Sequence, residues 1–243
     1  MSSENLYNSY YSEKRILVLG GAGFIGSNIA AELINLDAKV TIIDGLMEHS
    51  GGNIQNINNI LSKIVFYNNR IEDINQIDII LSAQDIIIDS MGLASHQLGM
   101  NNPRLDVEMN FMNHFYLLEK LKNIFHKKII YLGSRAQYGK LNDSLIDESS
   151  PQNPIDSQGI SKMAVEYYFK IFQAKYAYDF ISLRLANCYG ENQNVGQGDI
   201  GLIGTFIRDL KNGKTIELYG EENRTRNILY IKEFYITYFY YMH

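Results

Sequence analysis

The feature that most constrains this chain is a glycine-rich turn between an apolar run and an amphipathic stretch. Gly20, Gly23 and Gly26 follow the apolar run 15–19 and lead into a helical pattern over 23–36. Gly20 permits a tight turn, and Gly23 lets backbone N–H groups approach a pyrophosphate without a Cβ in the way. Gly26 lets the helix pack closely on the strand. The spacing therefore predicts a dinucleotide-binding turn, with Phe24 and Ile25 also at the cofactor.

A carboxylate follows the next apolar run. Residues 39–43 end in Asp44, 18 residues beyond Gly26. A carboxylate at this position accepts hydrogen bonds from the ribose hydroxyls of adenosine and repels a 2′-phosphate. No Lys or Arg follows Asp44 closely. The sequence therefore predicts NAD rather than NADP as the cofactor.

Apolar runs and amphipathic stretches alternate along the rest of the chain. Further strands are predicted at 64–67, 85–88, 128–132 and 180–185, and further helices at 104–125 and 159–176. Continuous apolar strands separated by helices are typical of a parallel sheet buried on both faces. We therefore expect an α/β fold with a doubly wound, Rossmann-like parallel sheet.

The pattern divides the chain into three parts. We expect a flexible tail at 1–14, a dinucleotide-binding domain at 15–189 and a partial substrate-binding lobe at 190–243. The lobe is predicted to contain a glycine-rich loop, a helix near 205–212, a strand near 215–219 and a final helical stretch rich in Tyr and Phe. Its small size predicts a truncated C-terminal substrate lobe.

Composition excludes several classes of protein. The 243 residues include 22 Lys and Arg against 27 Asp and Glu, a net charge of 22 − 27 = −5, which argues against a nucleic-acid partner. The single cysteine, Cys188, excludes an intramolecular disulfide and a cysteine-cluster metal site, and we expect no metal. No stretch approaches the ~20 apolar residues of a membrane helix, and residues 1–14 lack the apolar core of a secretory signal. We expect a cytoplasmic protein that does not contact membranes.

Several further motifs resemble those of the extended short-chain dehydrogenase/reductase family of nucleotide-sugar epimerases and dehydratases. The resemblance covers about residues 15–240 and includes the glycine turn. Asp73 and Ile74 lie where the family has an Asp-Ile-x-Asp stretch near adenine, although Arg70 replaces the first acid. The resemblance implies three more cofactor positions, which are the small-residue turn Ser90-Met91-Gly92, the helical Asn110 and Lys162.

The family's active-site motifs occur in the same order. Ser134 lies in a segment similar to the family's Ser-Ser-x-x-x-Tyr-Gly turn, and Lys162 matches its catalytic-helix lysine. The resemblance implies that Ser134 orients a substrate hydroxyl and that Lys162 binds the nicotinamide ribose. It also implies that Asn187 and Arg226 hold the diphosphate of a nucleotide sugar. Arg135 and Ala136 replace the acid pair of the 4,6-dehydratases, so we expect no dehydration.

One departure affects the chemistry directly. The family's general base is a Tyr four residues before the lysine, and that position is Gln158. An amide has no proton equilibrium near neutral pH and cannot act as a base. The sequence leaves Lys162, Asp156, His96 and Tyr138 as replacements, and His96 equally fits an ordinary loop histidine. We assign Ser134, Gln158 and Lys162 to the catalytic centre, where Gln158 binds the sugar without taking its proton.

These observations support one leading hypothesis and two rivals. The leading hypothesis is an NAD-dependent oxidoreductase or epimerase that transfers hydride at a ring carbon of a nucleotide-linked sugar, and the resemblance implies that this carbon is C4. The first rival is a catalytically silent NAD-binding homologue that regulates or partners an active enzyme, and the second is an NAD-binding protein for an unrelated substrate. The helices at 104–125 and 159–176 resemble the pair that forms the family's dimer contact and carry apolar residues on more than one stripe. We expect a homodimer or larger homo-oligomer.

Overall fold

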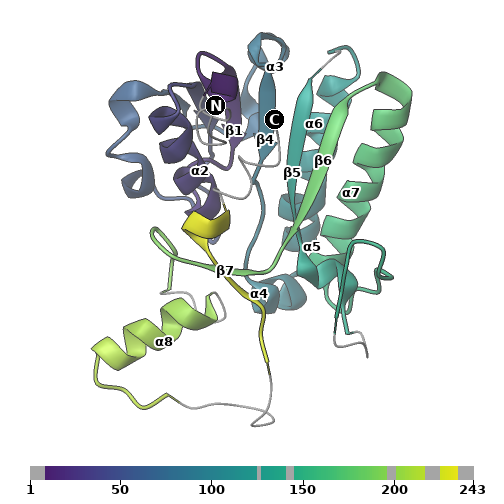
Figure 1. Cartoon of the computed structure of the whole chain (residues 1–243). Coiled ribbons are helices and arrows are strands. Elements are labelled where there is room, and N and C mark those ends of the chain that lie inside the picture. Colours follow the sequence, from purple (N-terminus) through teal and green to yellow (C-terminus); the bar gives the residue numbers. More distant parts are fainter. Residues whose placement is uncertain (1–8, 125–126, 141–144, 196–200, 217–224, 235–243) are drawn as a thin grey trace.

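The apolar runs of the sequence form one parallel sheet. The computed structural model describes residues 9–124, 127–140, 145–195, 201–216 and 225–234. Its main sheet has the strand order β3-β2-β1-β4-β5-β6 with every pair parallel (Figure 1). The strands are β1 (Arg15–Leu19), β2 (Lys39–Ile43), β3 (Val65–Tyr67), β4 (Ile86–Asp89), β5 (Lys128–Ser134) and β6 (Asp179–Leu185). This order is that of the dinucleotide-binding fold and confirms the expected doubly wound sheet.

Helices connect the strands. They are α2 (Phe24–Asn35), α3 (Ile77–Ala83), α4 (His96–Asn101), α5 (Pro103–Val107), α6 (Asn113–Leu121), α7 (Ser157–Tyr176) and α8 (Leu202–Lys211). Short 3₁₀ turns cover Ile54–Ile57, Leu61–Lys63, Ile71–Asp73 and Arg135–Tyr138. The helix predicted at 104–125 runs from α5 through a π-helical turn, Glu108–Met112, into α6. The helix predicted from residue 159 begins two residues earlier, because Asp156 caps it by accepting a hydrogen bond from the Gly159 amide.

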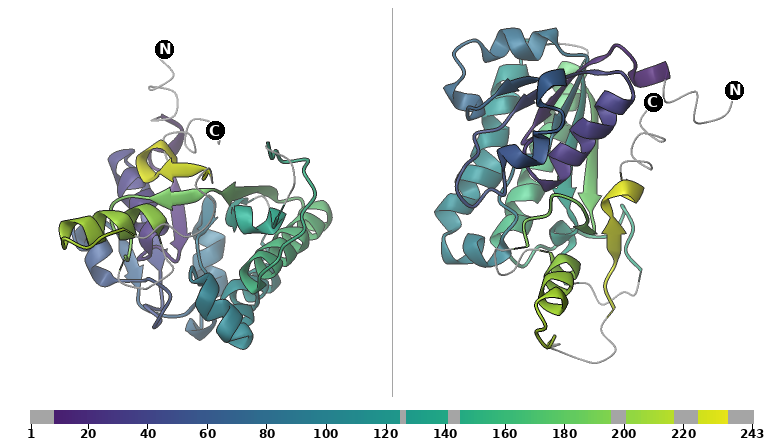
Figure 2. Two further views of the ribbon diagram at one scale, coloured as in Figure 1. Left: turned by 90° about the horizontal axis from the view of Figure 1, so that it is seen from below. Right: turned by 90° about the vertical axis from the view of Figure 1, so that its left-hand side faces the viewer.

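Alternate residues of the strands face two separate cores. On β1, Ile16 and Val18 pack with α2, whereas Leu17 and Leu19 pack with α3, α6 and α7. Figure 2 shows helices on both sides of the sheet. Because both faces are buried, the strands read as continuous apolar runs. The second core contains the stacked rings of Phe169 and Phe180, whose centroids are 4.7 Å apart.

The segment before β1 differs from expectation where the structure describes it. Residues 1–14 were expected to form a flexible tail, but Ser9–Tyr11 are helical and the Tyr11 side chain is only 1% exposed. The Lys14 carbonyl also accepts a hydrogen bond from the Lys39 amide. Burial of the Tyr11 ring against the α2 core holds residues 9–14 on the sheet.

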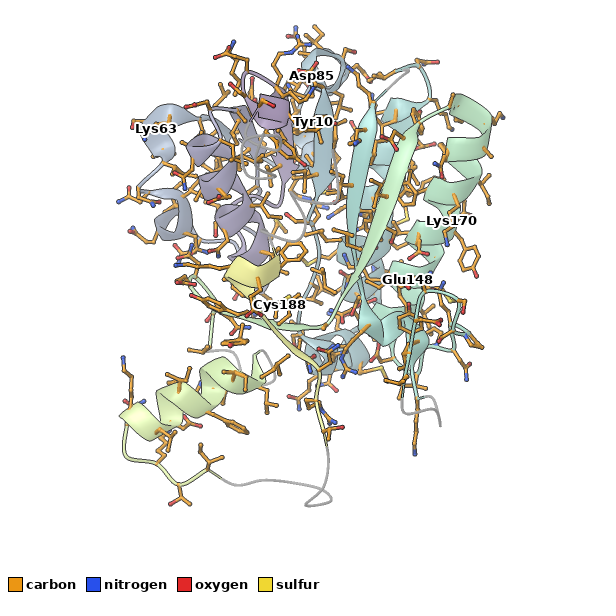
Figure 3. All side chains as sticks on the ribbon, in the orientation of Figure 1. Tyr10, Lys63, Asp85, Glu148, Lys170 and Cys188 are labelled. Carbon is orange, nitrogen blue, oxygen red and sulfur yellow. The ribbon has the colours of Figure 1, made fainter. Side chains whose placement is uncertain are left out.

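The chain leaves the sheet through β6 and forms a second, two-stranded sheet. Strand β7 (Asn187–Tyr189) pairs in parallel with β8 (Ile228–Tyr230), and α8 lies beside them (Figure 1). Figure 3 shows Cys188 of β7 at the opposite end of the sheet from Tyr10. The predicted helix near 205–212 corresponds to α8. Of the strand predicted at 215–219, residues 215–216 are not in a strand and the rest lie outside the described residues.

The final helical stretch is described only in part. Residues 231–234 are helical, and Ile231 and Phe234 are buried in the α2 core. The remainder of the predicted Tyr-rich helix lies outside the described residues. In the described part of the chain, no helix has both the length and the apolar character needed to cross a membrane.

Candidate functional site

The glycine turn has the geometry of a phosphate cradle. Gly20 has φ +70°, and a Cβ there would lie 2.9 Å from the Ser90 carbonyl oxygen. A Cβ on Gly26 would lie 2.4 Å from the Gly20 oxygen, so no larger residue fits. Gly23 is the N-cap of α2 and supplies no side-chain cap, which leaves N–H groups of the first helical turn available to an anion.

Asp44 is positioned at the end of β2 by two backbone amides. Its carboxylate oxygens accept hydrogen bonds from Ala22 N and Leu46 N, each at 2.9 Å. Burial raises the pKa of Asp44 above its ordinary value although both hydrogen bonds act to lower it. Each carboxylate oxygen retains a second lone pair for a ribose hydroxyl. Asp44, Gly20 and Gly23 line one cavity, as expected for an adenosine site.

The residues that form the far wall of this cavity differ from those that the resemblance implies. It is lined by Arg70, Ile71 and Glu72, which follow β3. Asp73 is exposed, and neither Asp73 nor Ile74 lines the cavity. Arg70 forms an ion pair with Glu72. Of the turn after β3, the structure brings Arg70, Ile71 and Glu72 to this cavity and not Asp73 and Ile74, the two residues that the resemblance implies.

The turn after β4 joins the two halves of the site. Ser90, Met91 and Gly92 line both the adenosine cavity and a larger cavity of about 440 Å³. Asn110 does not line either cavity. Its amide instead accepts from Leu93 N at 2.8 Å and donates to Leu93 O at 3.2 Å, so that it holds the turn from behind.

Lys162 is buried between this turn and β5. Its Nζ donates to Met91 O at 2.9 Å and to Leu132 O at 3.2 Å. Burial lowers the pKa of Lys162 to about 8, with Asp89 and Asp106 acting in the opposite direction. Gly92 makes this approach possible, since a Cβ there would lie 3.1 Å from Nζ.

Gln158 and Ser134 lie in the same large cavity as Lys162. Gln158 donates its side-chain amide to Leu93 O at 2.7 Å. The Ser134 hydroxyl accepts from Ala136 N at 3.1 Å and caps the turn Arg135–Tyr138. Ser134 therefore both caps a turn and faces the cavity.

The small sheet contributes the opposite wall of the cavity. Pairing of β7 with β8 brings Asn187 and Arg226 to the same cavity as Ser134. Asn187 accepts a hydrogen bond from Arg135 Nε at 3.2 Å. The cavity thus contains two guanidinium groups, a set of donors suited to a phosphate.

The candidate bases are separated by the structure. The Tyr138 hydroxyl accepts from Arg184 Nη1 at 2.7 Å and lines a different cavity. His96 lines the large cavity and lies with its Nδ1 3.0 Å from Asp156 Oδ2. Among the described residues, no group of three or more His, Cys, Asp or Glu side chains is arranged to hold a metal ion.

Several residues of the site were not predicted from the sequence. The roles of the Leu93 backbone and of Arg135 were not predicted, and neither was the wall formed by Arg70 and Glu72. Arg135 directly follows Ser134, so its position was the available signal. A backbone carbonyl such as that of Leu93 leaves no signal in the sequence.

The sequence and the fold of this chain are similar to those of known proteins. The model of the NAD dependent epimerase/dehydratase family matches residues 16–242. A protein of Methanocaldococcus jannaschii, provisionally named a UDP-glucose 4-epimerase, is 33% identical over 89% of this chain and 69% of its own length. The UDP-N-acetylglucosamine 4-epimerase of Methanobrevibacter ruminantium M1, solved with UDP-N-acetylmuramic acid, is 31% identical, with a TM-score of 0.85 over 92% of this chain and 71% of that chain. The UDP-glucose 4-epimerase of Thermotoga maritima, solved with UDP-glucose, is 29% identical, with a TM-score of 0.81 over 90% of this chain and 70% of that chain.

The chain belongs to the NAD dependent epimerase/dehydratase family. NAD is the cofactor of this family, and the residues present fit it. The glycine cradle leaves no room for a Cβ at Gly26, and Asp44 is placed for the ribose hydroxyls. Lys162 lines the larger cavity and donates to Met91 O, in the turn that lines both cavities.

Proposed function

We propose that the chain is an NAD-dependent oxidoreductase or epimerase that acts at C4 of a nucleotide-linked sugar. The observation that carries the proposal is that Ser134, Lys162, Asn187 and Arg226 line one cavity that adjoins the adenosine site. The similarity to the UDP-sugar 4-epimerases of Methanobrevibacter and Thermotoga supports C4 as the reacting carbon.

The residues have distinct roles in this proposal. When bound, NAD supplies a hydride acceptor at its nicotinamide ring. Lys162, held as an ammonium by two carbonyl oxygens, offers a remaining proton to the nicotinamide ribose. The Ser134 hydroxyl orients the sugar hydroxyl, and Gln158 accepts a hydrogen bond from the sugar through its carbonyl oxygen while its amide stays on Leu93 O.

The other end of the substrate meets the small sheet. Asn187 and Arg226 hold the diphosphate, and Arg135 reinforces Asn187 through their 3.2 Å hydrogen bond. Charge-assisted hydrogen bonds from guanidinium groups fix phosphates strongly and directionally. The sugar ring is thereby placed between the β5 turn and the nicotinamide position.

Incubation with UDP-glucose and with UDP-N-acetylglucosamine tests this function. We expect NMR of the products to reveal the C4 epimer or the 4-keto sugar, and we expect the absorbance band of reduced cofactor in a single turnover. Ser134→Ala should slow turnover about 10²-fold or more while leaving NAD affinity unchanged.

The rival proposal is a silent NAD-binding partner of an active enzyme. It is favoured by one observation, the amide of Gln158 at the position of the family's base. In that case the protein should retain NAD, measured by mass spectrometry of the ligand released on denaturation, and convert neither sugar even at stoichiometric concentration.

A further inference from the structure

His96 and Asp156 meet at the edge of the substrate cavity. His96 is the first residue of α4, whose N-cap is Ser95, and Asp156 is the N-cap of α7. The distance from His96 Nδ1 to Asp156 Oδ2 is 3.0 Å. His96 lines the large cavity together with Ser134, and all three side chains line a smaller adjoining pocket. The imidazole is 47% exposed, as a group that faces an open cavity must be.

The hydrogen bonds of Asp156 determine the tautomer of the imidazole. Asp156 Oδ1 accepts from Gly159 N at 2.7 Å, which leaves Oδ2 for His96. The hydrogen bond from His96 lowers the pKa of Asp156, as does the amide of Gly159, although burial acts in the opposite direction. An ionised Asp156 accepts the proton on Nδ1, so the basic lone pair of the neutral imidazole is on Nε2.

The cavity is also lined by the ionisable side chains of Lys162, Cys188 and Tyr189. Lys162 donates to two carbonyl oxygens, and with a pKa of about 8 it is mostly a protonated ammonium at neutral pH. The Tyr138 hydroxyl is bonded to Arg184 and lines another cavity. Gln158 has no proton to exchange, and its amide is held by Leu93 O. Among the side chains that line the cavity, the imidazole of His96 is the group whose ordinary pKa lies near neutral pH, which suits it to accept a proton there.

We propose that His96, oriented by Asp156, is the general base that replaces the missing tyrosine, an inference that rests on the proposed function. The proton of the C4 hydroxyl passes to His96 Nε2, and the electron pair of the O–H bond forms the C=O bond. The electron pair of the C4–H bond leaves as hydride to the nicotinamide ring of NAD⁺. The products are a 4-keto sugar, reduced cofactor and an imidazolium that Asp156 stabilises. The return of hydride to C4 takes the proton back from Nε2.

The charged groups around His96 determine how kcat/KM depends on pH. Asp156 is the carboxylate that contacts it, and the cations that line the same cavity are Arg135, Lys162 and Arg226. The base is active when neutral, so kcat/KM should fall on the acidic side as the imidazole becomes protonated. Asp156→Asn should move the acidic fall of kcat/KM to lower pH, because this change removes the negative charge that favours the imidazolium. Since Asn is also a good N-cap, this change should leave the start of α7 intact.

Four variants test the assignment with UDP-glucose and UDP-N-acetylglucosamine as probes. His96→Ala should lower single-turnover hydride transfer about 10²–10⁴-fold without changing NAD affinity measured by calorimetry. Asp156→Asn should lower hydride transfer by a smaller factor and should also shift the acidic fall of kcat/KM to lower pH. Gln158→Tyr places a phenol beside Lys162, so the double variant His96→Ala with Gln158→Tyr should recover turnover. Nitrogen NMR of the wild type should show the proton on Nδ1 of His96.

The outcomes separate the two proposals. Turnover that is unchanged in His96→Ala overturns the role of His96 and leaves the proposed function standing. A double variant that stays as slow as His96→Ala, with NAD affinity intact, also overturns it, because a structural defect would not be repaired by a phenol. A wild type that converts neither probe while Gln158→Tyr does so overturns both proposals and favours the silent homologue.

Discussion

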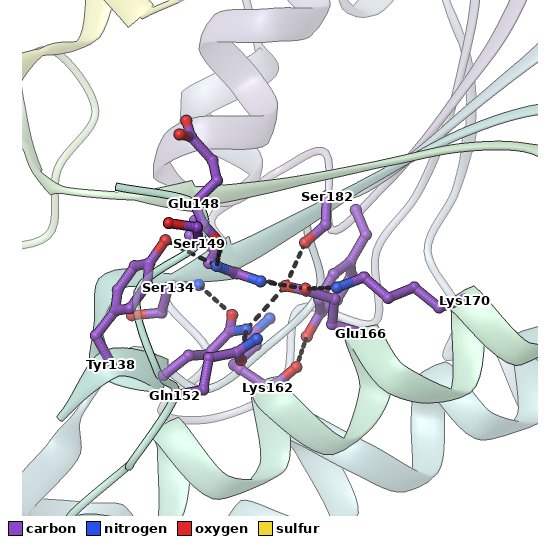
Figure 4. A network of polar contacts seen from close by, with 12 residues as sticks. Ser134, Tyr138, Glu148, Ser149, Gln152, Lys162, Glu166, Lys170 and Ser182 are labelled. Atoms are coloured by element: carbon purple, nitrogen blue, oxygen red, sulfur yellow. Dashed lines mark hydrogen bonds and ion pairs between the residues drawn. The ribbon is translucent and has the colours of Figure 1, made fainter. Parts of the chain in front are cut away.

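Glu166 and Arg184 form an ion pair behind the active-site turn, with Glu166 Oε1 2.6 Å from Arg184 Nη2. The Glu166 side chain is 1% exposed and accepts further hydrogen bonds from Lys170, Gln137 and Ser182 (Figure 4). Gln137 Oε1 in turn accepts from Ser134 N at 2.9 Å. The carboxylate of Glu166 is therefore connected through one side chain to the backbone of Ser134.

Glu166 should make the folded state sensitive to acid. Burial raises the pKa of Glu166, but the hydrogen bonds from Arg184, Lys170, Gln137 and Ser182 together lower it to about 2. Because this folded pKa lies below the unfolded value of 4.5, its stabilisation is present above pH 4.5 and is lost between about pH 4.5 and 2. Glu166→Gln should cost about 3 kcal/mol at pH 7 and remove that part of the acid dependence. Urea unfolding from pH 2 to 7 measures both, and parallel curves for the two proteins would refute the prediction.

Asp44 should determine the choice between NAD and NADP. Asp44→Ala should weaken NAD binding about tenfold or more, since it removes the acceptor of the ribose hydroxyls, and should reduce the preference over NADP. Calorimetric titration of both cofactors measures the two affinities. Asp44→Asn is the matched control, because it keeps an acceptor for Ala22 N or Leu46 N while it removes the charge. An unchanged ratio of NAD to NADP affinity in both variants would contradict the assignment.

Lys162 should make the cofactor-free protein more stable in alkali. Its folded pKa of about 8 lies below the unfolded value of 10.5, so the unfolded chain binds more protons between these two pH values. The free energy of unfolding should therefore rise with pH across this window, by up to about 1.4 kcal/mol per pH unit. The test compares urea unfolding of the wild type and Lys162→Met from pH 7 to 10.5. A difference between the two proteins that does not vary with pH would show that Lys162 keeps an ordinary pKa.

The outer face of α6 and α7 should form a dimer contact. Tyr167, Tyr168 and Ile171 are 51%, 39% and 61% exposed, and Tyr168 packs edge-on against Phe115 with 5.3 Å between centroids. Leu117 and Phe169 are apolar residues of the same two helices, but they are buried in the core of the subunit. We predict a dimer by light scattering and a monomer for Tyr168→Glu with Ile171→Glu.

A charge placed elsewhere is the control for the dimer. Ile79 on α3 is 65% exposed and lies on a different helix. Ile79→Glu should leave the mass unchanged, and a wild type that is monomeric at micromolar concentration would disprove the contact.

The sheet and the cofactor turn could be predicted because their signals are local. Apolar runs mark buried strands, and Gly20 and Gly26 occupy positions where a Cβ does not fit. The π-helical turn within the helix predicted at 104–125 was not predicted, since the apolar spacing of a π-helical turn differs little from that of an α-helix. The meeting of His96 with Asp156 could not be predicted, because 60 residues separate them and only the packing of α4 against α7 brings their first turns together. The burial of Tyr11 was not predicted, because a single buried ring in a short polar segment produces no hydrophobic pattern.

A single residue, Ala186, separates β6 from β7. Ser134 is in register with Leu185 on the last rung of the main sheet, and Asn187 opens the small sheet two residues later. The separation between these two side chains is therefore determined by a short stretch of continuous backbone. We therefore expect that a ligand which contacts both Ser134 and Asn187 is selected by its length.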